Sequence, residues 1–242
     1  MNVLLTGSNR GIGLGLVKAI LEKKAFKTVI ATCRRPEEAT ELKEIEKAHS
    51  NVHVLKLDVT DYSAFPNFAN EVGEIVGNEG LNVLINNAGI AGKFLKIGYL
   101  KHEAMLEAYS VNTVAPVMLA KAFMKLLKQG ALNCKDQQVG AAVVNITSVL
   151  GSISANDTGG YYPYRCSKAA LNAATKSLSI DLKPYDVLAV SIHPGWVRTE
   201  LGGEKAPMSV EESTVQIVDT VSNLRPEQTG TFLNYDGKSL DW

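Results

Sequence analysis

The sequence predicts an α/β protein built as one doubly wound parallel sheet with helices on both faces. Three observations lead to this prediction. Short apolar runs alternate along the whole chain with longer stretches whose apolar residues recur at helical spacing. A glycine-rich loop separates the first run from the first helical stretch, and no repeat, linker or low-complexity tract divides the 242 residues. Strands that alternate with helices are typical of a parallel sheet. Because no linker or repeat divides the sequence, residues 1–242 are assigned to a single domain.

The first half of the chain contains four expected strands and three expected helices. Val3 to Leu5 form an apolar run that ends before Gly7, and from Leu14 onward the apolar residues fall on one helical face. Pro36 suits the first turn of a helix, and residues 52–57 alternate as in a strand. The expected strands are residues 3–5, 28–31, 52–57 and 81–85, and the expected helices are residues 14–24, 36–48 and 61–76.

The second half continues the alternation with longer helices. A helical stretch covers residues 102–128, and we expect it to be interrupted only at Pro116, because proline disturbs a helix interior. The other expected helices are residues 164–183 and 211–224, and the expected strands are residues 139–146, 187–192 and 231–234.

The composition is that of an ordinary globular protein and excludes several classes. Lys+Arg and Asp+Glu each number 25, so no basic surface for nucleic acid is indicated. Cys33, Cys134 and Cys166 are widely spaced and form neither a disulfide framework nor a metal-ligand pattern, so we expect no metal. The chain begins with a strand-like run, and no continuous apolar run reaches the ~18 residues of a membrane span. We therefore expect a cytoplasmic protein with no nucleic-acid or membrane partner.

The loop after the first expected strand has the features of a dinucleotide-binding turn. Its glycines are spaced Gly-x-x-x-Gly-x-Gly and stand directly before a helix. Glycines let the backbone approach a pyrophosphate, whose negative charge the helix N-terminus favours. Taken alone, the spacing suits an ordinary tight turn equally well, but its place at the start of a βα repeat indicates a Rossmann-type fold. The residues expected at the cofactor are Gly7, Asn9, Arg10, Gly11, Ile12 and Gly13.

Polar residues and glycines follow most of the expected strands, at the edge where such sheets bind ligands. After the second strand stand Arg34 and Arg35, where NAD-binding proteins usually offer an acidic residue to the ribose 2′-hydroxyl. Guanidinium groups suit a phosphate, so together with Arg10 they favour NADP; the alternative is that Arg34 and Arg35 are solvated charges. Asp58, beside Val59, either bonds an adenine or supplies charge to the N-terminus of the next helix, and both interpretations stay open.

The stretch from residue 145 to 168 carries the reactive groups. In a helix that follows Pro163, Tyr164 and Lys168 stand four residues apart and share one face. A nearby ammonium stabilises a phenolate, so we expect Lys168 to lower the pKa of Tyr164 from its usual value near ~10 and to make it a proton donor. Ser148, at the end of a buried strand, can supply a hydroxyl to the same place.

Two other tyrosines precede Tyr164. Tyr161 pairs at the same spacing with Arg165, whose always-charged planar group suits a fixed ion pair better than proton transfer. Tyr162 pairs with Cys166, which offers no cation. Tyr164 is therefore the predicted acid.

Taken in order, these motifs resemble the short-chain dehydrogenase/reductase family, and within it the carbonyl reductases with their C-factor-like relatives. The motifs are Thr6-Gly7-x-x-x-Gly11-x-Gly13, Asn86-Asn87-Ala88-Gly89, Asn112, Ser148, Tyr164-x-x-x-Lys168 and Pro194-Gly195. The resemblance implies that Tyr164 donates a proton to the substrate oxygen and that Lys168 lowers its pKa and binds the nicotinamide ribose. It implies that Ser148 holds the carbonyl oxygen and that Asn112 anchors a water linking Lys168 to solvent. It also implies cofactor contacts from Asn87, Ala88, Gly89, Tyr164, Lys168, Pro194, Gly195, Val197 and Thr199.

One feature departs from the family pattern. Sixteen positions separate Ser148 from Tyr164, a few more than expected, with residues 156–160 as the insertion. Thr147 is therefore a rival to Ser148, and because adjacent side chains of a strand face opposite sides, only one of the two can face a substrate.

These residues predict an NADPH-dependent carbonyl reductase that acts on small aldehydes, ketones or quinones. The alternative is an NADPH-binding sensor or partner-binding protein of the same fold with little turnover. The substrate wall is expected from residues 90–100, 150–162 and 195–208, with Phe94 and Trp196 as aromatic surfaces, and residues 202–209 suit a lid. The helices at 102–128 and 164–183 either pair two copies into a homodimer or pack only on the sheet.

Overall fold

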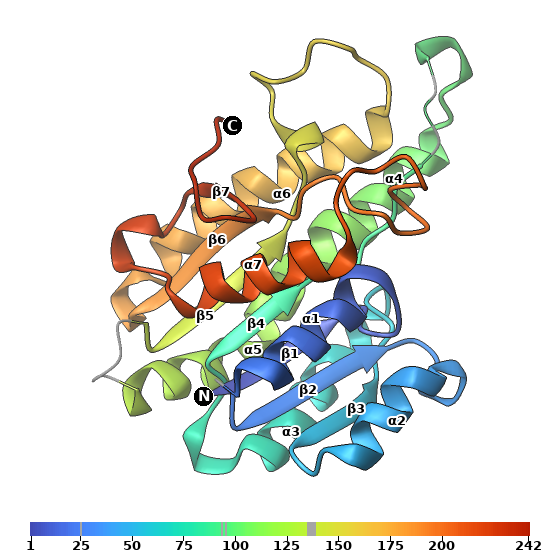
Figure 1. Cartoon of the computed structure of the whole chain (residues 1–242). Coiled ribbons are helices and arrows are strands. Elements are labelled where there is room, and N and C mark those ends of the chain that lie inside the picture. Colours follow the sequence, from blue (N-terminus) through green and yellow to red (C-terminus); the bar gives the residue numbers. More distant parts are fainter. Residues whose placement is uncertain (25, 93, 95, 135–138) are drawn as a thin grey trace.

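The computed structural model describes residues 1–242 except residues 25, 93, 95 and 135–138. Seven strands form one sheet in the order β3-β2-β1-β4-β5-β6-β7, and every neighbouring pair is parallel. The predicted doubly wound parallel sheet is thus confirmed (Figure 1). The strands are β1 (Asn2–Thr6), β2 (Thr28–Cys33), β3 (Val52–Lys56), β4 (Val83–Asn86), β5 (Ala141–Ile146), β6 (Val187–His193) and β7 (Phe232–Asn234).

Helices cover both faces of this sheet and enclose two apolar cores. On one face lie α1 (Gly11–Lys23), α2 (Thr40–Ala48) and α7 (Val210–Ser222). Their apolar residues pack on the strand residues that point to this face. On the other face lie α3 (Phe65–Val76), α5 (Ala115–Asn133) and α6 (Tyr162–Asp181), and α4 (His102–Tyr109) packs against α6. Both cores are fully buried because a parallel sheet exposes neither face. Because all neighbouring strands are parallel, their carboxyl ends lie along the same edge of the sheet.

The helical stretch after residue 102 differs from the expectation in an informative way. A π-helical turn, Ser110–Val114, joins α4 to α5, and Pro116 lies in the first turn of α5 without interrupting it. In a regular α-helix the ring of Pro116 would collide with the carbonyl of Asn112, four residues earlier. The widened turn avoids this collision, and the helix continues beyond residue 128 to Asn133.

Other element boundaries in the structure differ by a few residues from those expected from the sequence. The expected helices at 36–48 and 61–76 each begin with a short 3₁₀ turn, Pro36–Glu38 and Tyr62–Ala64, before α2 and α3. Strand β2 runs through Cys33, so Arg34 follows the strand directly. Helix α6 begins at Tyr162 rather than Tyr164, with Pro163 in its first turn. End residues fray and are the least certain part of a prediction from sequence.

The stretch His102–Asn133 is long and apolar enough, by length and composition, to cross a membrane, yet half of its most apolar window is buried within the fold. Length and composition are weak grounds for a membrane helix, because a core helix has the same features. Here α5 packs on β4, β5 and α3, so the sheet accounts for its apolar face.

Candidate active site

The glycine loop between β1 and α1 is locked against the loop that follows β4. Gly7 has a left-handed backbone with φ of 69°, which favours glycine. A Cβ at Gly13 would overlap the carbonyl of Gly7 and would lie 2.7 Å from Asn87 Nδ2. Asn87 Nδ2 donates to the carbonyl oxygens of Thr6 and Gly7 at 2.9 and 3.1 Å. We call residues 6–13 together with Asn87 and Ala88 the glycine cradle.

Thr6 ties the two halves of the glycine cradle together, although sequence reasoning treated it only as part of the motif. Its hydroxyl oxygen accepts from the backbone N–H groups of both Asn87 and Ala88 at 3.0 Å. Thr6 is buried at the end of β1, beside β4, so its side chain bridges adjacent strands. A threonine before the first glycine of such a loop is the sequence signal that could have identified this role.

Of the remaining loop residues, Arg10 and Gly11 lie next to the segment after β6. Asn9 and Arg10 are exposed, and Arg10 pairs with Glu200. Gly11 is left-handed, and a Cβ there would lie 3.4 Å from the methyl group of Thr199. Ile12 is partly buried against the core that α1 covers. Thr199 therefore lies next to the start of α1, and its contact with a cofactor stays a prediction.

The three arginines proposed for NADP selection have different partners. Arg35 pairs with Glu38 at 3.1 Å, and Arg10 with Glu200. Arg34 is exposed at the end of β2 and pairs with no carboxylate within the described part of the chain. Arg34 is thus the arginine of this group whose charge is available to a ligand.

Asp58 has a structural role that the sequence left open. Its Oδ1 accepts from the backbone N–H and the hydroxyl of Thr60 at 2.9 and 2.7 Å, which forms a turn before α3. These hydrogen bonds are the main reason that the pKa of Asp58 lies below its usual value. Val59 is buried beneath the turn. The turn leaves Oδ2 and the Val59 backbone as the groups that an adenine could meet.

Ser148 and Thr147 face opposite ways at the end of β5. The hydroxyl of Thr147 donates toward the carbonyl oxygen of Lys168 at 3.5 Å, into the interface with α6. The hydroxyl of Ser148 interacts with Tyr164 and lowers the pKa of that tyrosine. Ser148 Oγ also accepts from the backbone N–H of Leu150 at 3.1 Å. Of the two rivals, Ser148 is therefore the residue beside Tyr164.

The predicted acid does not have the lowered pKa that the sequence suggested. Desolvation raises the pKa of Tyr164 to about 12, and the contact with Ser148 offsets this only in part. Lys168 Nζ lies 5.8 Å from the centre of the Tyr164 ring and donates to the carbonyl oxygen of Ile146 at 2.8 Å. The expectation was wrong for the chain alone because burial disfavours a phenolate more than this distant ammonium favours it.

Lys168 is itself buried and perturbed. Only 4% of the residue is exposed, and burial lowers its pKa to about 8. A Cβ at Gly89 would lie 3.6 Å from Lys168 Nζ and 3.2 Å from Asn112 Oδ1. The loop after β4, the π-helical turn and α6 therefore meet around this amine.

Asn112 lies in the π-helical turn and is fully buried. Its Oδ1 accepts from the N–H of Ile90 at 2.9 Å, and its Nδ2 donates to the Ile90 carbonyl and to Ser167 Oγ at 2.8 and 3.0 Å. The Asn112 side chain is thus bound to groups on two other segments of the chain. Ser167, which sequence reasoning missed, is buried next to Lys168 and completes this contact.

The segment after β6 forms a folded arm over the same edge. The carbonyl of Pro194 accepts from Ser213 on α7 at 2.6 Å, and Gly195 is left-handed with φ of 84°. Val197 is buried and bridges to Met208. The arm, residues 195–209, also contains the contact between Trp196 Nε1 and the Gly202 carbonyl at 2.8 Å. It includes the segment predicted as a lid, and its two ends are held together.

His193, the last residue of β6, adjoins the site. Its Nδ1 accepts from the backbone N–H of Val149 at 3.2 Å, one residue after Ser148. Burial lowers the pKa of His193 to about 4, so the neutral ring that this hydrogen bond requires persists at ordinary pH. Its place at the end of β6 could have indicated this contact.

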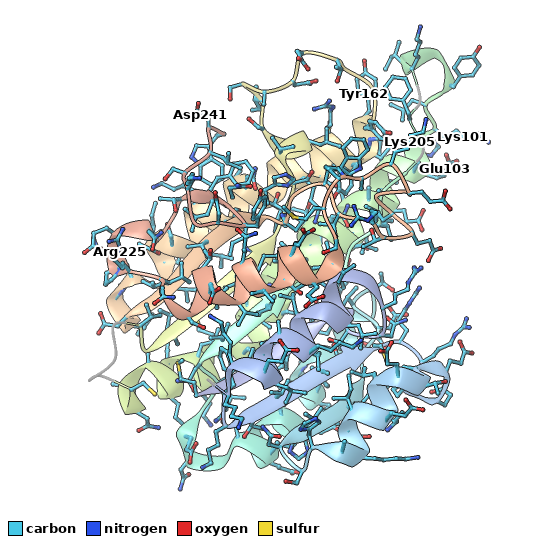
Figure 2. The ribbon with its side chains drawn as sticks, in the orientation of Figure 1. Lys101, Glu103, Tyr162, Lys205, Arg225 and Asp241 are labelled. Carbon is cyan, nitrogen blue, oxygen red and sulfur yellow. The ribbon has the colours of Figure 1, made fainter. Side chains whose placement is uncertain are left out.

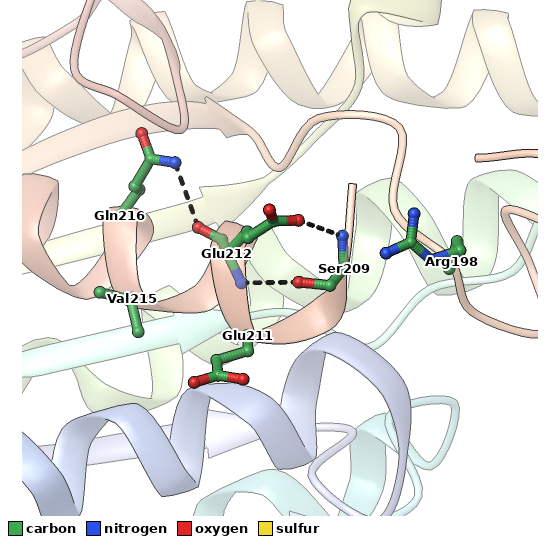
Figure 3. A pocket seen from close by; sticks show the side chains of 6 residues that line it. All are labelled: Arg198, Ser209, Glu211, Glu212, Val215 and Gln216. Carbon is green, nitrogen blue, oxygen red and sulfur yellow. Dashed lines mark hydrogen bonds between the residues drawn. The ribbon is translucent and has the colours of Figure 1, made fainter. Parts of the chain in front are cut away.

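Two of the predicted substrate segments meet where the rings of Phe94 and Tyr161 are in contact. Lys93 and Leu95 lie outside the described residues. Tyr162 marks the start of α6, and Lys101 and Lys205 mark loops on the side of the molecule where the strands end (Figure 2). A separate shallow hollow of about 520 Å³ lies beside the capped N-terminus of α7 and is lined by Arg198, Ser209, Glu211 and Glu212 (Figure 3). None of the predicted catalytic residues lines it.

Comparisons with known proteins define the class. The family model for short chain dehydrogenases matches residues 1–209, so the chain belongs to the short-chain dehydrogenase family. Among solved structures, it is similar to the carbonyl reductase Sniffer of D. melanogaster, with 47% identity and a TM-score of 0.98 over 100% of this chain and 99% of that one. It is also similar to an NADPH-bound carbonyl reductase from chicken fatty liver, with 39% identity and a TM-score of 0.93 over 100% and 98%.

A further relative is the C-signal of Myxococcus xanthus, with 38% identity over 67% of this chain and 93% of that protein. These relatives confirm the resemblance to carbonyl reductases and their C-factor-like relatives, and they place the chain among the oxidoreductases.

Proposed function

We propose that the protein is an NADPH-dependent carbonyl reductase that acts on small aldehydes, ketones or quinones. The observation that carries the proposal is the meeting of Ser148 and Tyr164 at the end of β5, with Lys168 buried behind them. The relative from chicken liver is an NADPH-bound carbonyl reductase, which supports the choice of both cofactor and substrate class.

The residues present fit a nicotinamide dinucleotide. Gly7 and Gly13 allow the glycine loop to fold tightly, because a Cβ would collide with Ala88 at Gly7 and with the Gly7 carbonyl at Gly13. The N-terminus of α1, at Gly11, lies in this loop, where it favours a pyrophosphate. The exposed guanidinium of Arg34 stands where a ribose 2′-phosphate would need a cation. The remaining contacts would come from Asn87, Ala88, Gly89 and the arm from Pro194 to Thr199. When bound, NADPH supplies a hydride to the carbonyl carbon.

Tyr164 provides the proton that the carbonyl oxygen then needs. With a pKa of about 12 its hydroxyl is protonated at neutral pH, which is the state a general acid requires. Ser148 Oγ accepts a hydrogen bond from the N–H of Leu150, and its hydroxyl, which lies beside Tyr164, can turn to donate to the substrate oxygen. Two donors aimed at one oxygen stabilise the negative charge that develops there.

Lys168 supports the tyrosine after the proton has moved. Its pKa of about 8 leaves the ammonium mostly charged at pH 7, in a buried position where charge is weakly screened. Asn112 uses both N–H groups of its amide on Ile90 and Ser167, so it holds the loop after β4 beside Lys168. Any water that it binds must be held by its oxygen atoms.

The test is NADPH oxidation with a panel of aldehydes, ketones and quinones, with Tyr164→Phe measured alongside. We expect turnover by the native protein and a loss in kcat of at least roughly a hundredfold in the variant, since general acid catalysis contributes about that much. Tyr185→Phe, at an exposed tyrosine outside the expected substrate segments, is the matched control and should keep native activity. Tight NADPH binding without turnover on any member of the panel would contradict the proposal and favour a sensor.

A further inference from the structure

Two aromatic side chains from separate loops meet near the catalytic residues. Phe94, in the segment between β4 and α4, and Tyr161, directly before α6, have ring centres 5.2 Å apart and planes inclined at 77°. Phe94 follows Ile90, whose backbone Asn112 holds, and Tyr161 stands three residues before Tyr164. The pair therefore joins the two loops that flank the Ser148–Tyr164 centre.

The backbone at Tyr161 is held in an unfavourable conformation. Its φ of 47° and ψ of 31° are left-handed, which costs a non-glycine residue roughly 1 kcal/mol or more. Gly159 and Gly160 before it are left-handed as well, with φ of 65° and 66°. Such strain persists only where surrounding contacts determine the conformation, and it often marks a site with a function.

Those surrounding contacts can be named. Arg165 is buried, and its guanidinium donates to the hydroxyl of Thr158 at 2.9 Å and to the Leu150 carbonyl at 3.3 Å. The N–H of Arg165 donates to the Tyr161 carbonyl at 2.9 Å. Both ends of the loop from Leu150 to Tyr161 are thus tied to α6. These contacts fix the Tyr161 backbone without any contribution from Phe94.

Gly160 determines how closely Phe94 can approach. A Cβ at Gly160 would lie 2.7 and 2.8 Å from Cζ and Cδ2 of the Phe94 ring, closer than real contacts allow. One edge of Phe94 therefore packs directly on the backbone of Gly160. Half of Phe94 remains exposed nonetheless, so apolar ring surface stays free beside the site.

We propose that Phe94 and Tyr161 form an aromatic clamp that determines substrate specificity by stacking on flat aromatic carbonyl compounds. The proposal rests on the carbonyl reductase function above. Aromatic rings prefer edge-to-face and offset stacked contacts, and the half-exposed Phe94 keeps ring surface for the ligand while Tyr161 holds the Phe94 ring in place. A short aliphatic aldehyde reaches Tyr164 without touching the clamp. The clamp favours aromatic ketones and quinones over such aldehydes.

The experiment compares 1,4-naphthoquinone with propanal as substrates of the full-length chain with NADPH. The variants are Phe94→Ala, Phe94→Leu and Tyr161→Asn, since leucine keeps bulk without a ring and asparagine tolerates the left-handed backbone. We expect KM for naphthoquinone to rise roughly tenfold in all three, as loss of aromatic contact area predicts, while kcat/KM for propanal changes less than about twofold. Tyr185→Ala, which removes an exposed ring outside the expected substrate segments, is the control and should match the native protein.

A merely structural role would lower activity on both substrates together and would also weaken NADPH binding, measured by fluorescence titration. That outcome, or native naphthoquinone kinetics in Phe94→Leu, would overturn the clamp. If the native protein reduces neither substrate, carbonyl reduction of these classes fails instead. The clamp is then tested by calorimetric binding of naphthoquinone to the NADP⁺-loaded protein, where Phe94→Ala should weaken binding and an unchanged affinity would overturn it.

Discussion

The glycine cradle and the substrate loops share one edge of the sheet but are held by different kinds of contact. In the cradle, backbone lies against backbone: the Gly13 position touches Gly7, and Thr6 and Asn87 satisfy the main chain across two strands. In the loops, side chains make the contacts: Arg165 binds Thr158, Phe94 packs on Tyr161, and Trp196 binds the Gly202 carbonyl. Several glycines there have open space around them. The difference teaches that one edge of the sheet combines two parts with different tolerance to substitution. The glycine cradle tolerates almost no added side-chain atoms, whereas the substrate loops can change their side chains and so the ligand that they accept.

The most direct test of this difference is to add one methyl group to the glycine cradle and one to the substrate loops, by a glycine-to-alanine substitution in each. Gly13→Ala should cost at least the ~1–3 kcal/mol typical of overpacking and should abolish NADPH binding, because the Cβ overlaps the Gly7 carbonyl. Gly92→Ala meets nothing within 4 Å and should change the free energy of unfolding by less than about 0.5 kcal/mol. Urea denaturation and NADPH titration measure both. Equal effects at the two positions would refute the distinction.

The buried Lys168 should produce a pH-dependent effect on stability. Because burial lowers the pKa of Lys168 to about 8 from 10.5, the unfolded chain binds more protons than the folded chain between these values. The stability of the native protein should therefore rise with pH through this window by about 3 kcal/mol relative to Lys168→Met. The methionine variant should accordingly be the more stable one at pH 7.

Urea denaturation from pH 7 to 10.5 measures this difference, with Lys125→Met, at an exposed position on α5, as the control that follows the native curve. A native curve parallel to that of Lys168→Met would show that the amine is not desolvated.

The expected cofactor site should also distinguish NADPH from NADH, and it should do so through Arg34. Arg34→Ala should weaken NADPH binding roughly tenfold to a hundredfold, the worth of a hydrogen bond between charged groups, and leave NADH unchanged. Arg35→Ala should have a smaller effect, because Glu38 already pairs with Arg35. Fluorescence titration with both cofactors tests this. Equal binding of NADPH and NADH by the native protein would exclude the 2′-phosphate role.

The smallest effect is expected where the arm of residues 195–209 meets α7. Ser209 caps this helix by accepting from the N–H of Glu212 at 3.1 Å, and Glu212 returns a bond to the Ser209 N–H. Ser209→Ala should cost about 1 kcal/mol and lower Tm by about 2–4 °C without changing NADPH affinity. Ser222→Ala, at the other end of α7, is the control for thermal melting. A large loss of NADPH affinity in Ser209→Ala would mean that the arm belongs functionally to the cradle.

Local patterns were sufficient for the fold. The alternation of strands and helices and the glycine loop predicted the parallel sheet, which the strand order confirms. Helix spacing put Tyr164 and Lys168 on α6, and the polar ends of strands indicated the correct edge. Boundaries shifted where turn chemistry acted locally, as at Pro36 and Tyr62. Pro116 was expected to break its helix, whereas a π-helical turn before it relieves the collision.

The sequence by itself determined the fold class, the edge that carries the site and the residue types gathered there, because periodicity and turn residues act over a few neighbours. Tertiary structure alone decided that Ser148 rather than Thr147 faces Tyr164, that Asn112 holds Ile90, and that Thr6 binds the loop after β4. It also decided that Tyr164 has a raised pKa, since desolvation depends on all the chain packed around a group. Contacts between residues far apart in sequence and the dielectric environment are properties of the folded whole, which no local pattern contains.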